Sequence, residues 1–262
     1  MLLDLSNKKA LVCGASQGIG EATAHALAAQ GAEVILLART RVKLETLKAQ
    51  LPTPKNQSHQ ILALDLNNID LLKESLSQIL LEKGPISLVI NNAGGPKSGP
   101  LLEATDNDFI QAFQSHILSS SAIAQLVVPG MKAQKFGRFV NIISTSVKVP
   151  IANLGVSNTI RNAMAGWSKS LANELAPFGI TVNNVLPGYT ETPRLEALAE
   201  AAALRLNKTA HDIKTLWKAA TPAGRFATPQ ELADAICFLA SPSAGFITGI
   251  NLPVDGGRTP CL

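Results

Sequence analysis

The chain has 262 residues, of which 46% are hydrophobic and 16% charged, and its formal net charge of +4 is mild. No run of Lys and Arg concentrates this charge, so nucleic-acid binding is not expected. No apolar run is long enough for a membrane span, and residues 1–9 lack the hydrophobic core of a signal peptide. The three cysteines, Cys13, Cys237 and Cys261, have no metal-ligand spacing, so we expect a reducing, cytoplasmic location and no metal site.

Short apolar runs alternate with longer amphipathic segments from one end of the chain to the other. The expected strands are Lys9–Cys13, Glu33–Leu37, Gln60–Leu64, Ile86–Ile90, Arg138–Ile143, Thr181–Val185 and Ile250–Val254. The expected helices are Ile19–Gln30, Val42–Leu51, Ile69–Leu81, Asp106–Gln134, Ser157–Ala176 and Pro229–Ala240. Strands separated by helices in this way form βαβ units. The pattern predicts one α/β domain over residues 1–262, a Rossmann-type doubly wound parallel sheet of about seven strands with helices on both faces.

Two segments interrupt this alternation. Residues 51–58 form a polar, proline-containing loop, and residues 191–221 are rich in Ala and Leu. The second segment predicts a helical insert before the last helix. Because loops beyond the strand ends usually carry specificity, we expect residues 191–221 and 95–101 to recognise the substrate.

A glycine-rich turn joins the first expected strand directly to a helix, in Cys13-Gly14-Ala15-Ser16-Gln17-Gly18-Ile19-Gly20. Glycines let such a turn tighten, let backbone N–H groups approach a pyrophosphate, and let helix and strand pack closely. Tight turns need glycine for structural reasons too, but the position after the first strand favours a dinucleotide site. The candidate contacts are Gly14, Ser16, Gln17, Gly18, Ile19 and Gly20.

The end of the second strand indicates which dinucleotide is bound. An Asp or Glu there would bind the ribose 2′-hydroxyl of NAD, whereas an Arg accommodates the 2′-phosphate of NADP. The segment Leu36-Leu37-Ala38-Arg39-Thr40-Arg41 contains no carboxylate and two guanidinium groups. The two arginines could simply be solvated residues at a helix start, but basic residues are unfavourable at that end of a helix dipole. Arg39 therefore favours NADP(H) over NAD(H).

Over nearly its whole length, the chain resembles the short-chain dehydrogenase/reductase family. The matching segments are the glycine turn, Asp65 after the third strand, Asn91-Asn92-Ala93-Gly94, Pro187-Gly188, Gly224-Arg225-Phe226, Thr248-Gly249 and Val254-Asp255-Gly256-Gly257. The resemblance implies that Asp65 and Leu66 contact the adenine and that Asn91, Ala93 and Gly94 line the nucleotide cleft. It also implies that Pro187, Gly188, Thr190 and Thr192 hold the nicotinamide carboxamide and a neighbouring phosphate.

The resemblance fails in the active site, where the family normally carries Asn, Ser, Tyr and Lys. The family serine corresponds to Ser144, but the Tyr position is Ser157 and the Lys position is Arg161. His116 occupies the asparagine position. The segment Ser157-Asn158-Thr159-Ile160-Arg161 resembles a divergent bacterial subgroup with Ser and Arg in place of Tyr and Lys. Misalignment does not hide the phenol, because the one tyrosine, Tyr189, follows Pro187-Gly188.

These substitutions remove the usual proton donor. Ser144 can still polarise a carbonyl, and Arg161 can still bind a ribose, but a guanidinium does not shuttle protons. Three sources of the proton remain open: His116, Lys148 on the loop after Ser144, and a water held by Ser157.

The sequence therefore leaves several functions open. The first is an NADP(H)-dependent oxidoreductase of a carbonyl or hydroxyl group, similar to 3-oxoacyl-[acyl-carrier-protein] reductases. The expected substrate is a small molecule, with an acyl thioester as one candidate. Reduction of an activated C=C bond is the second, and the third is a nucleotide-binding protein without turnover. The resemblance also implies a homo-oligomer, a dimer or tetramer, paired through residues 106–134 and 157–176.

Overall fold

The computed structural model describes residues 3–261, and its central sheet confirms the predicted fold class. Seven strands pair in the order β3-β2-β1-β4-β5-β6-β7, and every pairing is parallel. The strands are β1 (Lys9–Cys13), β2 (Glu33–Ala38), β3 (Gln60–Ala63), β4 (Leu88–Asn91), β5 (Gly137–Ile142), β6 (Ile180–Pro187) and β7 (Asn251–Val254). The order reverses between β1 and β4, which is where open parallel sheets bind their ligands.

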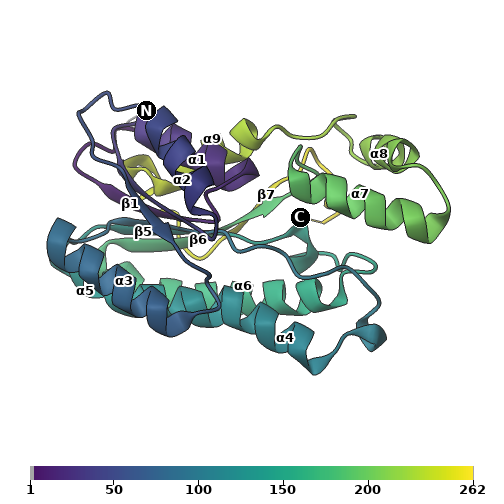
Figure 1. Ribbon diagram of the computed structural model, residues 1–262, viewed down its shortest axis with the longest axis horizontal. Helices are drawn as coiled ribbons and strands as arrows, with labels where there is room; N and C mark the ends of the chain where they lie inside the picture. The colour runs from purple at the N-terminus through teal and green to yellow at the C-terminus, as the bar shows by residue number, and fades with distance from the viewer. Residues whose placement is uncertain (1–2, 262) are drawn as a thin grey trace.

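Helices cover both faces of the sheet (Figure 1). One layer holds α1 (Gly18–Ala29), α2 (Arg41–Gln50) and α9 (Pro229–Ala240), with α1 packed against α9. The other holds α3 (Ile69–Lys83), α4 (Asp106–Phe113), α5 (Ser119–Gln134) and α6 (Gly155–Leu175). Two separate clusters of buried Leu, Ile, Val and Ala fill the spaces on either side of the strands. Such strands are apolar on both faces because both are covered.

The long helix expected over 106–134 is not continuous. It is interrupted between α4 and α5 by a π-helical turn, η2 (Gln114–Leu118), which contains His116. A π turn accommodates extra backbone by widening the helix, and such turns are frequent at functional sites. The widened turn brings the His116 ring to the backbone of Gly94, with Nε2 lying 3.1 Å from the carbonyl oxygen.

The predicted insert consists of two helices, α7 (Pro193–Leu206) and α8 (Ala210–Ala219). Thr192 caps α7, and Thr209 with Asp212 forms a capping box at the start of α8. The two helices pack on each other through a small apolar cluster built on Ala199, Ala203 and Ile213. In Figure 1 they project beyond the ends of β6 and β7, so their inner face is available to line a site. Within residues 3–261, no helix is both long and apolar enough to cross a membrane.

Candidate active site

A cavity of about 1000 Å³ lies at the carboxyl ends of the strands, where the strand order reverses. Its lining is contributed by the glycine turn, the segments after β2, β3, β4 and β5, the start of α6, and the insert. Most of the residues that the sequence indicated meet there: Gly14, Ser16, Gln17, Gly18, Ile19, Arg39, Asp65, Leu66, Ala93, Gly94, Ser144, Ser157, Arg161, Pro187, Gly188, Thr190 and Thr192. Gly20, Asn91 and His116 do not line this cavity.

The glycine turn combines left-handed backbone with very close packing. Gly14 and Gly18 both have φ near +60°, a conformation that only glycine adopts without strain. Gly20 has ordinary helical backbone, but a Cβ there would lie 2.2 Å from the carbonyl oxygen of Gly14. Its role is to let α1 approach the strand end. Gln17, the N-cap of α1, makes no side-chain capping bond, so the amides of the first helical turn are left for a ligand.

Basic side chains border the end of the cavity next to β2. Arg39 lies on the wall and is exposed, while Arg41 lies outside the cavity and pairs with Glu45 at 3.5 Å. Sequence analysis missed Lys43, which also lines the wall. Its spacing of four from Arg39, across the start of α2, could have indicated it. On the neighbouring strand end, after β3, Asp65 accepts a hydrogen bond from the Asn67 amide at 2.9 Å.

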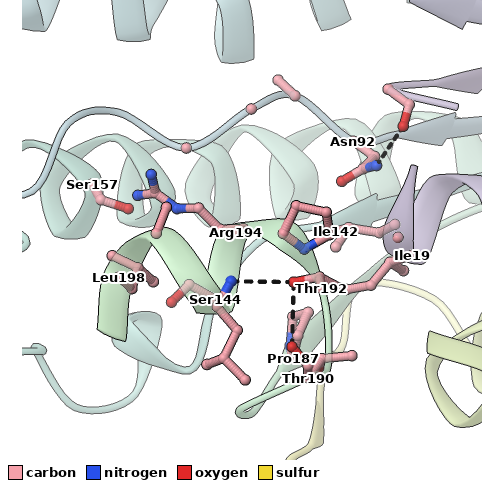
Figure 2. A pocket seen from close by; sticks show the side chains of 18 of the residues that line it. Ile19, Asn92, Ile142, Ser144, Ser157, Pro187, Thr190, Thr192, Arg194 and Leu198 are labelled. Carbon is pink, nitrogen blue, oxygen red and sulfur yellow. Dashed lines mark hydrogen bonds between the residues drawn. The ribbon is translucent and has the colours of Figure 1, made fainter. Parts of the chain in front are cut away.

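The loop after β6 forms another wall through a chain of short-range hydrogen bonds. Thr190 Oγ1 donates to the carbonyl of Gly188, and Thr192 Oγ1 donates to the carbonyl of Thr190, both at 3.2 Å. Figure 2 shows the second bond, between the labelled Thr192 and Thr190. The Leu195 amide donates to Thr192 Oγ1 at 3.3 Å. Gly188 permits this path, because a Cβ there would lie 2.6 Å from Asp255 Cα. The Thr192 side chain faces Gly18, so this loop and the glycine turn enclose the cavity from two sides.

Three residues at the predicted catalytic positions share the cavity. Ser144 is the N-cap of a short 3-10 turn after β5, and its Oγ accepts from the Ser146 amide at 3.0 Å. Ser157 lies in the first turns of α6, buried against the protein but on the cavity wall. Arg161, one turn further along α6, is 7% exposed. The three come from two elements, and only the packing of α6 against the end of β5 brings them together.

Arg161 is held by its packing but is incompletely satisfied. Its Nη1 donates to the carbonyl of Ile142 at 2.8 Å, whereas the buried Nε has no hydrogen-bond partner. Burial, and then the charge of Arg194, lower the pKa of Arg161 to about 10, so the side chain stays cationic at neutral pH. A buried N–H without a partner costs free energy, so the position of this guanidinium is held by its packing and by the bond to Ile142.

His116 and Asn91 lie behind the main cavity, around a small void. The Nε2 contact with Gly94 is consistent with a neutral ring donating to that carbonyl. Burial, and then the charge of Arg161, hold the pKa of His116 well below its usual value. Asn91 donates to Asn141 at 2.8 Å within a buried amide network, while its neighbour Asn92 faces the cavity and donates to Gly14. The Asn91 side chain is therefore engaged within the protein. Its contact with a cofactor stays a prediction, and that contact would have to be made by the Asn91 backbone.

The insert and the C-terminal loop contribute residues that sequence analysis did not single out. Arg194, Arg205, Trp217 and Arg258 all line the cavity. Tyr189, placed by the sequence on the cofactor loop, stacks on Trp217 with ring centroids 4.7 Å apart. No local motif marks these positions, because the insert and the last residues meet the site only through the tertiary fold.

The fold and this cavity are those of a dinucleotide-binding α/β protein, and the insert lines part of the same cavity. Residues 14–259 match the family model described as enoyl-(acyl carrier protein) reductase. The chain is 33% identical over 257 residues to the 3-oxoacyl-[acyl-carrier-protein] reductase FabG of Vibrio cholerae serotype O1, covering 97% of this chain and 98% of that protein. It is 35% identical over 255 residues to the monensin polyketide synthase putative ketoacyl reductase of Streptomyces virginiae, covering 96% and 97%.

Solved structures agree with these relatives. YwfH, described as an NADPH-dependent reductase involved in bacilysin biosynthesis, superimposes with a TM-score of 0.92 at 28% identity, over 98% of this chain and all of that one. L-sorbose reductase from Gluconobacter frateurii, solved with NADPH and L-sorbose, also gives 0.92, at 27% identity over the full length of both chains. The chain belongs to the short-chain dehydrogenase/reductase family, and its relatives are oxidoreductases.

Proposed function

We propose that this protein is an NADP(H)-dependent reductase that transfers hydride to the carbonyl carbon of a small substrate, with a proton donor other than the usual phenol. The observation that carries the proposal is the shared cavity. The glycine turn, the loop after β6, Ser144, Ser157 and Arg161 all face one space, as hydride transfer to a held carbonyl requires. Residues 1–262 act as one catalytic unit, with α7 and α8 as the substrate-recognition insert.

The residues present fit a nicotinamide dinucleotide phosphate. The uncapped amides of α1 suit the pyrophosphate, and Arg39 with Lys43 suits a 2′-phosphate at the end of β2. Asp65 and Leu66 remain the proposed adenine contacts, and the loop from Pro187 to Thr192 holds the carboxamide. The bound cofactor would supply the hydride. One similar protein is described as an NADPH-dependent reductase and another was solved with NADPH, which supports this choice.

Negative charge develops on the substrate oxygen as the hydride arrives, and the cavity holds groups that stabilise it. The Ser144 and Ser157 hydroxyls donate hydrogen bonds to that oxygen, and the buried cation of Arg161 favours the charge. Arg161 lines the same cavity, and we propose that its terminal nitrogens also donate to the ribose. Arg161 is not the proposed proton source, because a guanidinium does not shuttle protons, and its role is electrostatic.

Of the three proton sources, we favour a water held by Ser157. His116 faces Gly94 behind the cavity wall, and its lowered pKa keeps the ring neutral, which makes it a poor acid. We propose that His116 instead positions the loop after β4. Lys148 is exposed and does not line the cavity. Tyr189 does line it, but burial, against the opposing influence of Arg258, raises the pKa of its phenol.

The second candidate is reduction of a C=C bond conjugated to that carbonyl. The observation that favours it is the serine in place of a phenol at position 157. Hydride addition to the β-carbon yields an enolate, whose oxygen the same hydroxyls and Arg161 stabilise. Protonation then occurs at carbon in a later step, so no acid needs to stand at the oxygen during hydride transfer.

The test is NADPH oxidation by the purified protein against ketones, diketones and 3-oxoacyl thioesters, with conjugated enones and enoyl thioesters in parallel. We expect turnover on at least one panel and a decrease of about 10²–10³ in kcat for Ser144→Ala with little change in NADPH affinity. Product analysis separates alcohols from saturated carbonyls. Tight NADPH binding without turnover on any panel would refute both reductase proposals and favour a nucleotide-binding role.

Assembly and location are further proposals. We propose a homodimer or homotetramer paired through α4, α5 and α6. Ile110 and Phe113 of α4 and Leu118 of the π-helical turn η2 are exposed apolar side chains in this region. Light scattering of the purified protein tests this. A cytoplasmic location stays a prediction.

A further inference from the structure

Two guanidinium groups from different elements approach each other across the substrate compartment. Arg161 projects from α6, and Arg194 projects from the first turn of α7, the first helix of the insert. They are close enough for the charge of Arg194 to disfavour the protonated form of Arg161. In Figure 2 the Arg194 guanidinium points away from its own helix, toward the wall that carries Ser157. Like charges that face each other around a cavity destabilise it unless an anion lies between them.

The hydrogen bonds of Arg194 leave most of its donors free. Its Nη2 donates to the carbonyl of Pro96 at 2.7 Å, which ties α7 to the loop after β4. The guanidinium also lies against Gly95, where a Cβ would be 3.0 Å from Nη2. This contact holds the planar fork over the compartment. No carboxylate within residues 3–261 forms an ion pair with it.

A third guanidinium, that of Arg258, is fixed beside the serine that holds the reacting oxygen. It lies 4.3 Å from the centroid of the Tyr189 ring and donates to the phenol oxygen at 3.2 Å. Its Nη1 also lies 3.5 Å from Thr145 Oγ1, one residue after Ser144. Since Tyr189 stacks on Trp217, this arginine is part of a rigid wall that joins the C-terminal loop to the insert. A guanidinium restrained in this way loses little entropy when it binds a carboxylate.

The charge of the compartment is not balanced by the protein. Among the described residues that line the cavity, Asp65 is the one carboxylate, and it follows β3, at the end where the adenine is proposed to bind. Arg161, Arg194 and Arg258 lie around the end that carries Ser144 and Ser157, and Arg205 adds a further charge on α7. A ligand that carries negative charge therefore suits this end of the cavity.

We infer that the substrate is a small molecule with a free carboxylate near its reacting carbonyl, and that Arg194 and Arg258 bind this carboxylate. The inference rests on the proposed function and names its substrate class. A carboxylate fits because an arginine fork donates two parallel hydrogen bonds to it. An acyl thioester fits less well, since the atoms next to its carbonyl are uncharged and its phosphate lies at the far end of a long arm.

The cofactor's own phosphates are the alternative source of negative charge. The pyrophosphate belongs at the start of α1, and the 2′-phosphate belongs beside Arg39, both away from Ser144. Arg258 contacts Thr145, the neighbour of Ser144, and Tyr189. An anion bound by Arg258 therefore lies near the serine proposed to hold the substrate oxygen. The experiment separates the two sources by measuring cofactor affinity and substrate preference independently.

The test compares a ketone acid with its ester. Benzoylformate and its methyl ester, and acetoacetate and its ethyl ester, are assayed for NADPH oxidation by the wild-type protein and by Arg194→Gln, Arg258→Gln and Arg258→Lys. Arg225→Gln is the control, because it removes one positive charge from a surface ion pair outside the cavity. NADPH dissociation constants are measured by fluorescence for each variant. Thermal shifts of the NADP⁺ complex with each acid and each ester report binding without turnover.

We expect kcat/KM for at least one acid to exceed that for its ester by about ten- to a hundredfold, the range for a hydrogen bond to a charged group. Arg194→Gln and Arg258→Gln should each remove at least tenfold of this preference, and Arg258→Lys should restore part of it. NADPH affinity and the Arg225→Gln control should change little. This pattern supports a carboxylate substrate.

The other outcomes have distinct meanings. Equal turnover of acid and ester overturns the carboxylate inference and leaves the reductase proposal standing. If an acid raises the Tm through Arg194 and Arg258 but nothing turns over, the reductase proposal fails and the anion site stands. A parallel loss of NADPH affinity in both arginine variants assigns these residues to the cofactor and overturns the inference. An NADP⁺ complex whose Tm responds to neither acid overturns it as well.

Discussion

Replacing Gly20 by Ala tests whether the close approach of α1 to the strand end is what builds the cofactor site. An Ala Cβ would lie 2.2 Å from the carbonyl oxygen of Gly14 and 2.8 Å from Nδ2 of Asn92. Ordinary contacts begin near 3.4 Å, so the helix must move away from the turn by more than 1 Å. The atoms that would have to yield are backbone and a hydrogen-bonded amide, not the end of a flexible chain.

The expected cost follows from two opposing terms. Overpacking of this severity costs about 3 kcal/mol, and Ala in place of Gly inside a helix recovers about 0.5–1 kcal/mol. A net loss of about 2 kcal/mol in the free energy of unfolding corresponds to a decrease of roughly 5 °C in Tm for a chain of this size. Because the amides at the start of α1 move with the helix, NADPH affinity should fall by at least tenfold.

Urea unfolding and NADPH fluorescence titration measure these two quantities. Gly166→Ala in α6 is the matched control, because nothing lies within 4 Å of a Cβ at that helical position, its φ is not positive and it does not line the cavity. Its free energy of unfolding should rise by about 0.5–1 kcal/mol, as expected for Ala in place of Gly inside a helix, and its NADPH affinity should not change. A Gly20→Ala protein with wild-type stability and wild-type NADPH affinity would refute the packing argument for this glycine.

Three further predictions address the cofactor end, the buried histidine and the catalytic positions. Arg39→Gln should weaken NADPH binding by about tenfold or more and leave NADH binding unchanged. Arg41→Gln should have little effect, because Arg41 is already paired with Glu45. Equal losses of affinity for both cofactors in Arg39→Gln would contradict the 2′-phosphate assignment. Burial lowers the pKa of His116 in the folded state, so the unfolded chain binds more protons than the folded chain as the pH falls below about 6.5. The stability of the wild type should therefore decrease on acidification. Urea midpoints measured between pH 7 and 5 should depend less on pH in His116→Asn than in the wild type. The double variant Ser157→Tyr/Arg161→Lys should reduce simple ketones faster than the wild type, as measured by NADPH oxidation. A double variant that binds NADPH but is inactive would show that the cleft no longer positions a phenol.

Local sequence determined the framework of this protein because the relevant signals act over short distances. Alternating apolar runs predicted the seven parallel strands, with boundaries within a few residues of those observed. The glycine spacing from Gly14 to Gly20 marked the turn, since left-handed backbone and close packing both require the absence of a side chain. The missing phenol at Ser157 was equally evident, because a chain with one tyrosine leaves no other assignment.

Tertiary structure decided what the substrate compartment looks like. Periodicity predicted one helix over 106–134, whereas the structure inserts a π turn that carries His116 to Gly94. Arg194 and Arg258 are 64 positions apart in the sequence and belong to no motif, so only the folding of the insert and the last residues over β6 brings them to one cavity. The glycine turn predicts a dinucleotide site through its local backbone geometry. The charge of the compartment arises from long-range packing, and it is this charge that indicates an anionic substrate.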